Sequence, residues 1–394
     1  MSPLRNRRFH FIVLLAIFLP GVHSTRPAGA VEVEKWLAAF GQLDGSAASD
    51  RAAAEAATEL QSLPSSDVTQ VLEGFTAADV RGKNWLRSVA ADVADNGDFP
   101  MESLMAYFQD RSKDKDARYT AFQLLSQHDP DSYESLLTDA ANDPSLPVRF
   151  LKIKSMIREA TKAKSDDPEL AVKILKDVVS NGRSPAQLET AAKLLSELGE
   201  EVDLANELGM MVSWWMIGPF DNTDSKNFDT VYLPETAYLQ SGSPIVRDAS
   251  GSRETATGKS DSVVEWQRIK SDDKLGMVDL NGPLSNEKDA AAYVFRRFQI
   301  EGPFTAAAQV RLGCITANKI WINGKLVTEN EVYHSGSRID QYVADCKLVN
   351  GTNTVLIKVM QNAQTQPWAQ DWQFQFRLTR EDGSAIKTTE PSQS

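Results

Sequence analysis

The 394-residue sequence is poor in the residues that build metal sites and nucleophilic active sites. It has four histidines, of which only His128 and His334 lie beyond the first thirty residues, and two cysteines. It contains none of the motifs HExxH, CxxC, GxSxG and GxxxxGK[ST]. These absences exclude a histidine-rich zinc site within one chain and leave no nucleophile motif beside either histidine. Carboxylate-only hydrolysis is not excluded, since two correctly placed acids suffice.

Basic residues are in deficit as well, with 42 Lys and Arg against 54 Asp and Glu. Residues 1–30 hold four arginines and no acid, so the formal net charge of −12 becomes −16 without them. Binding to duplex nucleic acid requires clustered basic groups that displace counterions, which this composition does not offer. The acidic residues are scattered, which favours a role in solubility.

Long hydrophobic runs are absent too. The longest, Phe11 to Leu19, is too short to span a bilayer. It follows a basic segment and precedes Pro20, Gly21 and two small-residue patterns, which predicts a signal peptide cleaved after Ser24 or Ala30. The alternative is a buried N-terminal helix. We therefore expect an exported protein, periplasmic or extracellular, with no transmembrane segment and, since no cysteine lies near the cleavage region, no lipid anchor.

Residues 31–208 carry helical periodicity. Val33, Trp36, Leu37 and Phe40 recur at spacings of three and four, and the alanine-rich segment from Asp50 begins with a capping residue. Asp-Pro pairs and glycine punctuate the turns, and strand-like alternation is nearly absent. This pattern predicts an α-helical domain.

A repeat is visible within this region, between Asp79 and Met156. Arg81, Arg118 and Arg149 each precede an apolar helical segment and follow a turn. This pattern is similar to that of HEAT repeats, which implies an α-solenoid of stacked helix pairs. The alternative is an irregular helical bundle. In either case we expect a scaffold or contact surface, with the arginines and aspartates forming turn-fixing ion pairs.

Residues 209–380 follow a different pattern, with Gly and Pro punctuation and six of the eight tryptophans. Asn323-Gly324 between alternating segments predicts a hairpin with a type I′ turn. Phe374 and Phe376 alternate with polar residues, which indicates a strand with one buried and one solvent-exposed face. Several such strands predict an antiparallel β-sandwich, and the fold class is α+β multidomain. We expect a flexible insertion at 240–262 and a disordered tail at 381–394.

The strand segments resemble the galactose-binding-like jelly roll of carbohydrate-binding modules and of domains appended to glycosidases. The resemblance rests on Trp321, Asn323, Gly324, Leu348, Gly351, Asn353 and Val355 to Val359. The upstream segment from Trp214 to Phe220, W-x-x-I-G-P-F, resembles the opening of a module in secreted multi-domain bacterial proteins. Within it we expect a first strand with Trp214 and Met216 on one face and Trp215 and Ile217 on the other. The resemblance implies a fold and not a ligand, because this fold serves sugars, other ligands and packing alike.

The loop from Tyr333 to Tyr342 is the candidate ligand site. An aromatic face with planar polar groups is suited to sugars, which the candidate residues supply: Tyr333, His334, Arg338, Asp340 and Trp368. The alternative is that an Arg338–Asp340 ion pair only pins the loop.

Two further features leave alternatives open. Asp221, Asp224 and Asp229 are candidate oxygen ligands for a structural Ca²⁺ ion, although their spacing does not match an EF-hand, and no other cofactor is expected. Cys314 and Cys346 either form a disulfide, which an exported chain permits, or remain two buried free thiols.

These observations favour an exported, non-enzymatic binding protein in which a helical scaffold carries a jelly-roll module for carbohydrate or cell-surface association. One alternative is a structural or protein-interaction component that uses the helical repeats as its contact surface. Another is a glycosidase or lyase that uses carboxylates.

Overall fold

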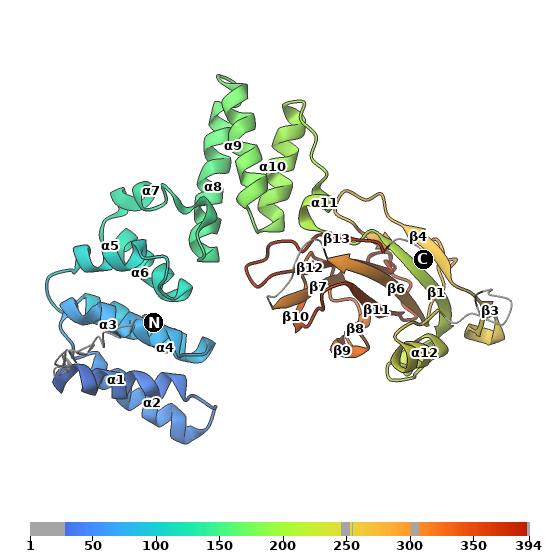
Figure 1. Cartoon of the computed structure of the whole chain (residues 1–394), viewed down its shortest axis with the longest axis horizontal. Coiled ribbons are helices and arrows are strands. Elements are labelled where there is room, and N and C mark those ends of the chain that lie inside the picture. The colour runs from blue at the N-terminus through green and yellow to red at the C-terminus, as the bar shows by residue number, and fades with distance from the viewer. Residues whose placement is uncertain (1–27, 246–252, 254, 301–306, 392–394) are drawn as a thin grey trace, which may run out of the picture. The chain divides into compact units, whose positions relative to one another are not determined.

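The computed structural model describes residues 28–245, 253, 255–300 and 307–391 (Figure 1). The predicted signal peptide therefore lies almost wholly outside the described residues. None of the helices in the described ranges is long and apolar enough to cross a membrane. The chain divides into two compact units, residues up to His128 and residues from Asp129 onward. Helices precede strands along the chain, as predicted, and the fold is α+β. The finer domain boundaries drawn from the sequence remain predictions.

The first unit is helical. Neighbouring helices pack in pairs, α1 with α2, α3 with α4 and α5 with α6. Their bounds are α1 Ala28–Gly41, α2 Ala47–Leu60, α3 Val68–Glu73, α4 Val80–Ala94, α5 Met101–Gln109 and α6 Lys115–His128. Polar caps start two of them, because Ser46 accepts from Ser49 N and Asp79 from Gly82 N. Phe40, Phe75 and Leu86 are fully buried in this unit.

The second unit begins with further helices. They are α7 Tyr133–Leu136, α8 Leu146–Ala163, α9 Pro168–Asn181, α10 Pro185–Glu197 and α11 Leu204–Leu208. Proline stands in the first turn of α8, α9 and α10, where its missing N–H costs nothing. Ile153, Leu175 and Leu195 belong to the shared core of α8, α9 and α10.

The arginines of the predicted repeat were expected to form ion pairs within the turns. In the structure they also donate hydrogen bonds to main-chain oxygens. Arg118 donates to Phe108 O at 2.9 Å, and Arg149 donates to Asp143 O at 2.8 Å. Both side chains are buried, whereas Arg81 stays half exposed. The buried positions of α4 are displaced by about one residue relative to those of α6 and α8, which turns Arg81 outward.

Two antiparallel sheets form the sandwich. The larger has the order β4-β1-β6-β11-β8-β9, with β13 beside β6, and the smaller has the order β10-β7-β12-β5. The strands of the larger sheet are β1 Ser213–Asp221, β4 Gln267–Lys270, β6 Ala290–Ile300, β8 Ala317–Ile322, β9 Lys325–Asn330, β11 Thr352–Gln361 and β13 Thr388–Thr389. Those of the smaller are β5 Val278–Asp279, β7 Ala308–Cys314, β10 Tyr342–Cys346 and β12 Gln373–Thr379. A separate pair joins β2 Ala256–Thr257 to β3 Val263–Val264.

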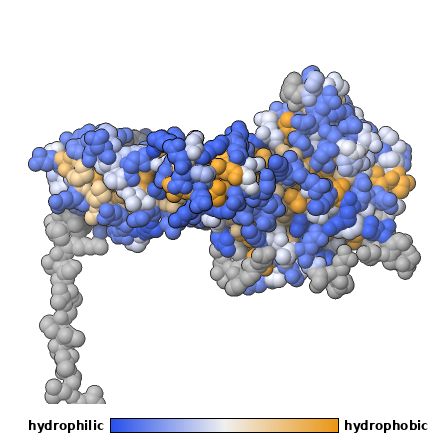
Figure 2. Space-filling model, turned by 90° about the horizontal axis from the view of Figure 1, so that it is seen from above, coloured by the Kyte–Doolittle hydropathy of each residue, from blue (hydrophilic) through white to orange (hydrophobic). Residues whose placement is uncertain are grey.

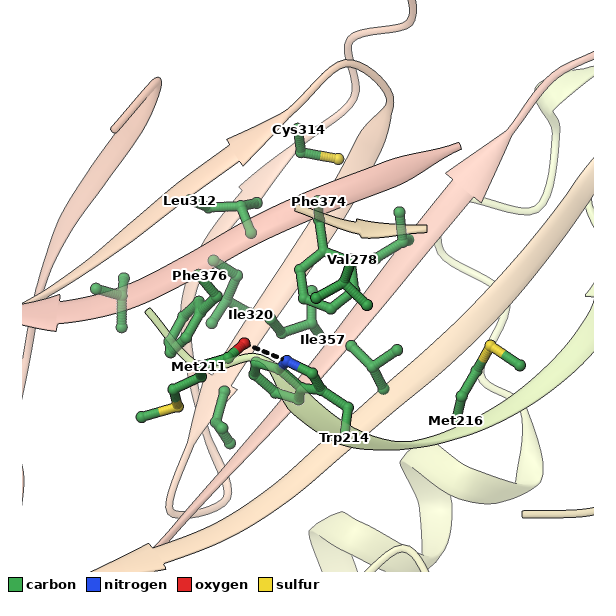
Figure 3. Close-up of a cluster of buried hydrophobic side chains, with 14 of the residues drawn as sticks. Met211, Trp214, Met216, Val278, Leu312, Cys314, Ile320, Ile357, Phe374 and Phe376 are labelled. Carbon is green, nitrogen blue, oxygen red and sulfur yellow. Dashed lines mark hydrogen bonds between the residues drawn. The ribbon is translucent and has the colours of Figure 1, made fainter. Parts of the chain in front are cut away.

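The core between the sheets is built around Trp214 (Figure 3). Its ring packs edge-on against Phe374 and Phe376, with centroids 5.3 and 5.6 Å away, and its indole Nε1 donates to Met211 O at 2.6 Å. Met216 belongs to the same core, whereas Trp215 and Ile217 pack on the opposite face of the sheet. The predicted alternation of the first strand is thus confirmed, and Trp214 is a core residue.

The larger sheet is covered on its outer face as well. There α12, Leu233–Ser241, brings Tyr238 against a second cluster that contains Phe220, Tyr293 and Phe295. Every residue of β8 is buried, because both faces of this strand are packed. The Asn323-Gly324 turn has positive φ at both positions, 50° and 78°, which confirms the predicted type I′ hairpin.

Strand β12 does not have the solvent-exposed face that the sequence predicts. Gln375 and Arg377 are buried on its outer side, where Gln375 Nε2 donates to Leu275 O at 2.9 Å. Segments distant in sequence cover that face, which local alternation cannot reveal.

The predicted tail and insertion are also partly structured. Within the predicted disordered tail, Ile386 is buried, Thr388–Thr389 form β13 and Glu390 pairs with Arg268. Within the predicted insertion, Ser241 ends α12 and Ala256–Thr257 form β2, while 246–252 and 254 lie outside the described residues.

The two cysteines are free and buried, which corrects the disulfide alternative. Cys346 pairs with Ala308 at one end of β7, while Cys314 lies at the other end of that strand. Six residues of strand separate the two positions by roughly 20 Å, far beyond the Cα separation that a disulfide can bridge.

Candidate functional site

Four loops meet at one end of the sandwich. Asp221, at the end of β1, and Gln361, at the end of β11, both pair with Ala290, the first residue of β6. On the smaller sheet, Cys314 at the end of β7 pairs with Phe374 near the start of β12. The connections that follow or precede these positions, 222–232, 280–289, 331–341 and 362–372, therefore share this end.

Asn222 ties these loops together. It is fully buried, its N–H donates to Asp289 O at 2.8 Å, and its Nδ2 donates to Tyr333 OH at 3.0 Å and to Gln361 O at 3.1 Å. Its Oδ1 accepts from Asn227 N at 3.3 Å. The main-chain N–H and the side chain of this one residue thus hold three loops in register with the strand ends.

Ligand sites in proteins have volumes of roughly 300–1,000 Å³, and the pocket formed here has a volume of about 450 Å³. It is lined by Asp224, Ser225, Asp289, Asn362, Ala363, Gln364, Thr365 and Gln366. Two of the lining residues, Asp289 and Gln364, each have a buried side-chain oxygen, Asp289 Oδ1 and Gln364 Oε1, that receives no hydrogen bond from any described residue. Buried acceptors without a donor are rare in proteins, so this pocket is suited to a ligand that donates hydrogen bonds.

The backbone around this pocket is strained. Asp224, Ser225 and Asp289 have φ values of 57°, 58° and 47°, and His334, which contacts Asn362, has φ of 60°. These values lie in the left-handed region that residues other than glycine seldom adopt. Such strain clusters at ligand and active sites, where the surrounding structure enforces it.

Two of the predicted site residues form hydrogen bonds with residues at this end of the sandwich. Tyr333 is half-buried and holds Asn222, and burial raises the pKa of its phenol. His334 donates its N–H to Ile315 O at 2.8 Å, and its Nε2 lies 2.6 Å from Asn362 Oδ1. Arg338 is exposed and does not line the pocket. The side chain of Trp368 lies outside the described residues.

Asp340 is part of a different cluster. It pairs with Arg311 at 3.0 Å and with Arg377, rather than with Arg338 as the ion-pair alternative required. Burial would raise the pKa of Asp340, yet hydrogen bonds and charge from Arg377 and Arg311 together hold that pKa below its ordinary value. Arg377 Nη1 also donates to Leu208 O at 3.2 Å, so this cluster fastens the end of α11 to the sandwich.

The three candidate Ca²⁺ ligands are engaged separately. Asp221 accepts from Thr223 and Asn227, Asp224 pairs with Lys226 at 2.8 Å, and Asp229 pairs with Lys319 at 2.6 Å. No group of three or more metal-ligating side chains occurs within the described ranges. A structural Ca²⁺ ion at these three aspartates stays a prediction.

Asn222, Asp289 and the segment 362–366 are not among the site residues predicted from the sequence. An available signal was the amide-rich stretch from Gln361 to Gln366, which follows an apolar strand directly. Its members fall at the strand end, where loops carry binding residues.

Comparisons with known proteins leave the family of this chain open. No family model matches it, and no curated protein matches its sequence. Among solved structures, part of the chain is similar to a β-glycosidase from Bacteroides vulgatus, with 14% identity, a TM-score of 0.24 and coverage of 43% of this chain and 20% of that one. It is also similar to a PA14 sugar-binding domain from an RTX adhesin, with 14% identity, a TM-score of 0.21 and coverage of 45% and 96%. A GH31 α-xylosidase from Xanthomonas citri gives 16% identity, a TM-score of 0.19 and coverage of 36% and 17%. The matched region spans a fifth or less of each glycosidase, and at these TM-scores the likenesses carry no argument about what this chain does.

Proposed function

We propose that this chain is an exported, non-enzymatic protein that binds carbohydrate at the loop end of its sandwich. The observation that carries this proposal is the pocket in which Asp289 Oδ1 and Gln364 Oε1 are buried without a donor. Sugar hydroxyls supply such donors. The amide side chains of Asn362 and Gln366 also line the pocket, and amides can both donate and accept, as hydroxyls do.

Within this proposal the sandwich is a galactose-binding-like jelly roll and the helices form a HEAT-like α-solenoid that presents it. Support for the repeat comes from Arg118 and Arg149, which make equivalent contacts with main-chain oxygens. Lys83 bridges Asp114 and Asp116 between α4 and the start of α6, as stacked repeats would require. Export follows from the predicted signal peptide. Amino-terminal sequencing of protein from its native host tests it, since an intact Met1 would contradict cleavage near Thr25 or Val31.

The alternatives make different demands on the molecule. A protein-interaction component would need a continuous apolar surface on the helices. On the face drawn in Figure 2, hydrophilic residues predominate and hydrophobic ones are scattered between them. A carboxylate-dependent glycosidase would use Asp224 and Asp289, the two acids of the pocket. Asp224 is engaged in an exposed ion pair with Lys226 at 2.8 Å.

A glycan array probed with the mature chain tests the proposal. We expect Gln364→Leu, which keeps the side-chain size but removes the acceptor, to weaken glycan binding roughly tenfold. Asp289→Asn, which tolerates the left-handed backbone, is expected to act in the same direction. Asp272→Asn is the matched control, because Asp272 is exposed in a loop outside the pocket.

Three results would contradict this assignment. The wild-type chain binds no glycan, the two pocket variants bind as well as wild type, or Arg338→Ala abolishes binding while the pocket variants do not. The last result would move the site to the 333–342 loop. Release of reducing sugar from a bound glycan, lost in Asp224→Asn, would support the enzymatic alternative.

A further inference from the structure

A second pocket lies in the first unit, on the outward face of α4. Arg81, Asn84, Trp85 and Ser88 follow one another at spacings that place them on a single helical face, and all four are exposed. Together with Leu43 and Asp50 they line a pocket of about 390 Å³. This volume lies within the range of ligand sites in proteins.

Trp85 supplies a fixed aromatic surface to this pocket. Its ring centroid lies 6.5 Å from that of buried Phe40, yet the residue keeps 38% of its surface exposed. In α6 and α8 the residue four positions after the arginine is Phe122 or Ile153, and both are buried. A large aromatic ring held from one side and exposed on the other is a platform on which a flat apolar ligand face can stack.

Hydrogen bonds to neighbouring groups orient the side chain of Arg81 without burying it. Its Nη2 donates to Leu43 O at 3.0 Å and its Nε to Asp79 at 3.4 Å, while about half of the side chain remains exposed. A Cβ at Gly45, where φ is +85°, would lie 2.8 Å from Arg81 Nη1, so the glycine leaves room for the guanidinium. The turn between α1 and α2 is therefore shaped around this arginine.

The charged and polar groups of the pocket indicate the chemical class of its ligand. It carries one acid, Asp50, one base, Arg81, an amide, Asn84, and a hydroxyl, Ser88. The opposite charges of Asp50 and Arg81 leave the pocket without a net charge, so it favours neither an anionic nor a cationic ligand. A neutral ligand with hydroxyl groups that both donate and accept, and with an apolar face for the indole, satisfies all of these groups.

We propose that this pocket binds a neutral saccharide through stacking on Trp85 and hydrogen bonds to Arg81 and Asn84. The site stands on the first unit alone and does not depend on the pocket of the sandwich. If both sites bind, the chain carries two saccharide sites, one in each unit.

The test uses the mature chain on a glycan array, with Trp85→Leu and Asn84→Ala as the site variants. Leucine keeps apolar contact with Phe40 but removes the aromatic face, so we expect a roughly tenfold loss for the glycans bound here. Phe150→Leu is the matched control, because Phe150 is also an exposed aromatic on a helix but lies outside the pocket. Circular dichroism confirms that each variant is folded.

Protection of Trp85 provides a direct readout. The best array glycan should slow oxidation of Trp85 by N-bromosuccinimide, measured by peptide mass spectrometry, and should still do so in Gln364→Leu. Unchanged binding in Trp85→Leu, or no protection of Trp85 by any bound glycan, overturns this site. Binding that is lost in Gln364→Leu but intact in Trp85→Leu overturns it and leaves the sandwich site standing. The reverse pattern overturns the sandwich site alone.

Discussion

Lys358 shows how a charged residue is accommodated in the packed interior. It is fully buried in β11, and its ammonium donates to three main-chain oxygens, Asn227 O at 3.2 Å, Phe228 O at 2.9 Å and Thr230 O at 2.7 Å. Burial lowers the pKa of this lysine to about 8, so it remains mostly protonated at neutral pH. The contacts fasten the loop after β1 to the sheet.

We predict that Lys358→Met destabilises the protein although methionine suits a buried position. The substitution leaves three buried oxygens without their donor, and each costs roughly 1–3 kcal/mol. Urea unfolding measures the loss. The control is Lys319→Met, whose partners Asp229 and Glu329 are largely exposed and lose little when unpaired. A Lys358→Met protein as stable as wild type would show that these three hydrogen bonds do not stabilise the folded state.

The sequence predicts the structural environment of some residues and not of others. Trp214 and Met216 were assigned to one face because strands alternate, a local rule. Lys358 interrupts the apolar run of β11, and nothing local distinguishes a lysine held by carbonyls from one at a strand edge. Asn222 and Asp289 were missed for the same reason, since their partners come from loops far apart in sequence.

Asp340 connects three elements. Its carboxylate receives hydrogen bonds from Arg311 on β7 and Arg377 on β12, and Arg377 in turn reaches the last residue of α11. The carboxylate is largely buried, so its loss leaves two largely buried arginines without their acidic partner.

We predict that Asp340→Asn lowers the free energy of unfolding by about 3 kcal/mol at pH 7. Because the pKa of Asp340 is lowered in the folded state, its contribution is complete above the ordinary pKa of an aspartate. It is lost as the pH falls through the folded pKa. The difference between wild type and variant should therefore be constant from pH 5 to 8, a range above the ordinary aspartate pKa of about 3.9, and should shrink in acid. A difference independent of pH down to acid unfolding would contradict the ion-pair explanation.

Elements defined by local rules were predicted best. The Asn323-Gly324 hairpin needs two positive φ angles, and few other dipeptides allow them. The outer face of β12 was predicted wrongly because Leu275 and the end of α11 cover it. Within the predicted tail, Ile386 is buried although the segment around it is otherwise polar, and composition does not reveal such a single anchoring residue.

On the scale of the molecule, the division into units was the hardest feature to foresee. The composition changes near residue 208, yet the compact units divide at His128. Helices α10 and α11 share a cluster with the sandwich side, in which Leu188, Leu204 and Leu208 pack with Met210. Such packing joins regions of different composition, and the change in composition near residue 208 coincides with the change from helices to strands.

The free thiols provide a test of cooperative folding in the second unit. Cys314 and Cys346 belong to one core, and burial raises the pKa of the first to about 11 and of the second to about 12. We predict that neither reacts with iodoacetamide in the native protein, and that both become reactive in one urea transition. Complete labelling of both under denaturing, non-reducing conditions is expected as well. Fast labelling of either thiol in the native state would contradict this account.

The distribution of tryptophan between the two units has a spectroscopic consequence. Trp36 and Trp85 lie in the first unit, and Trp85 is exposed, whereas Trp214 and Trp372 are wholly buried in the second. Exposed indoles emit at longer wavelength and are quenched by acrylamide, while buried ones are shielded. Emission at the blue edge therefore follows the second unit, whereas Trp85 of the first unit and half-buried Trp215 of the second both contribute at the red edge.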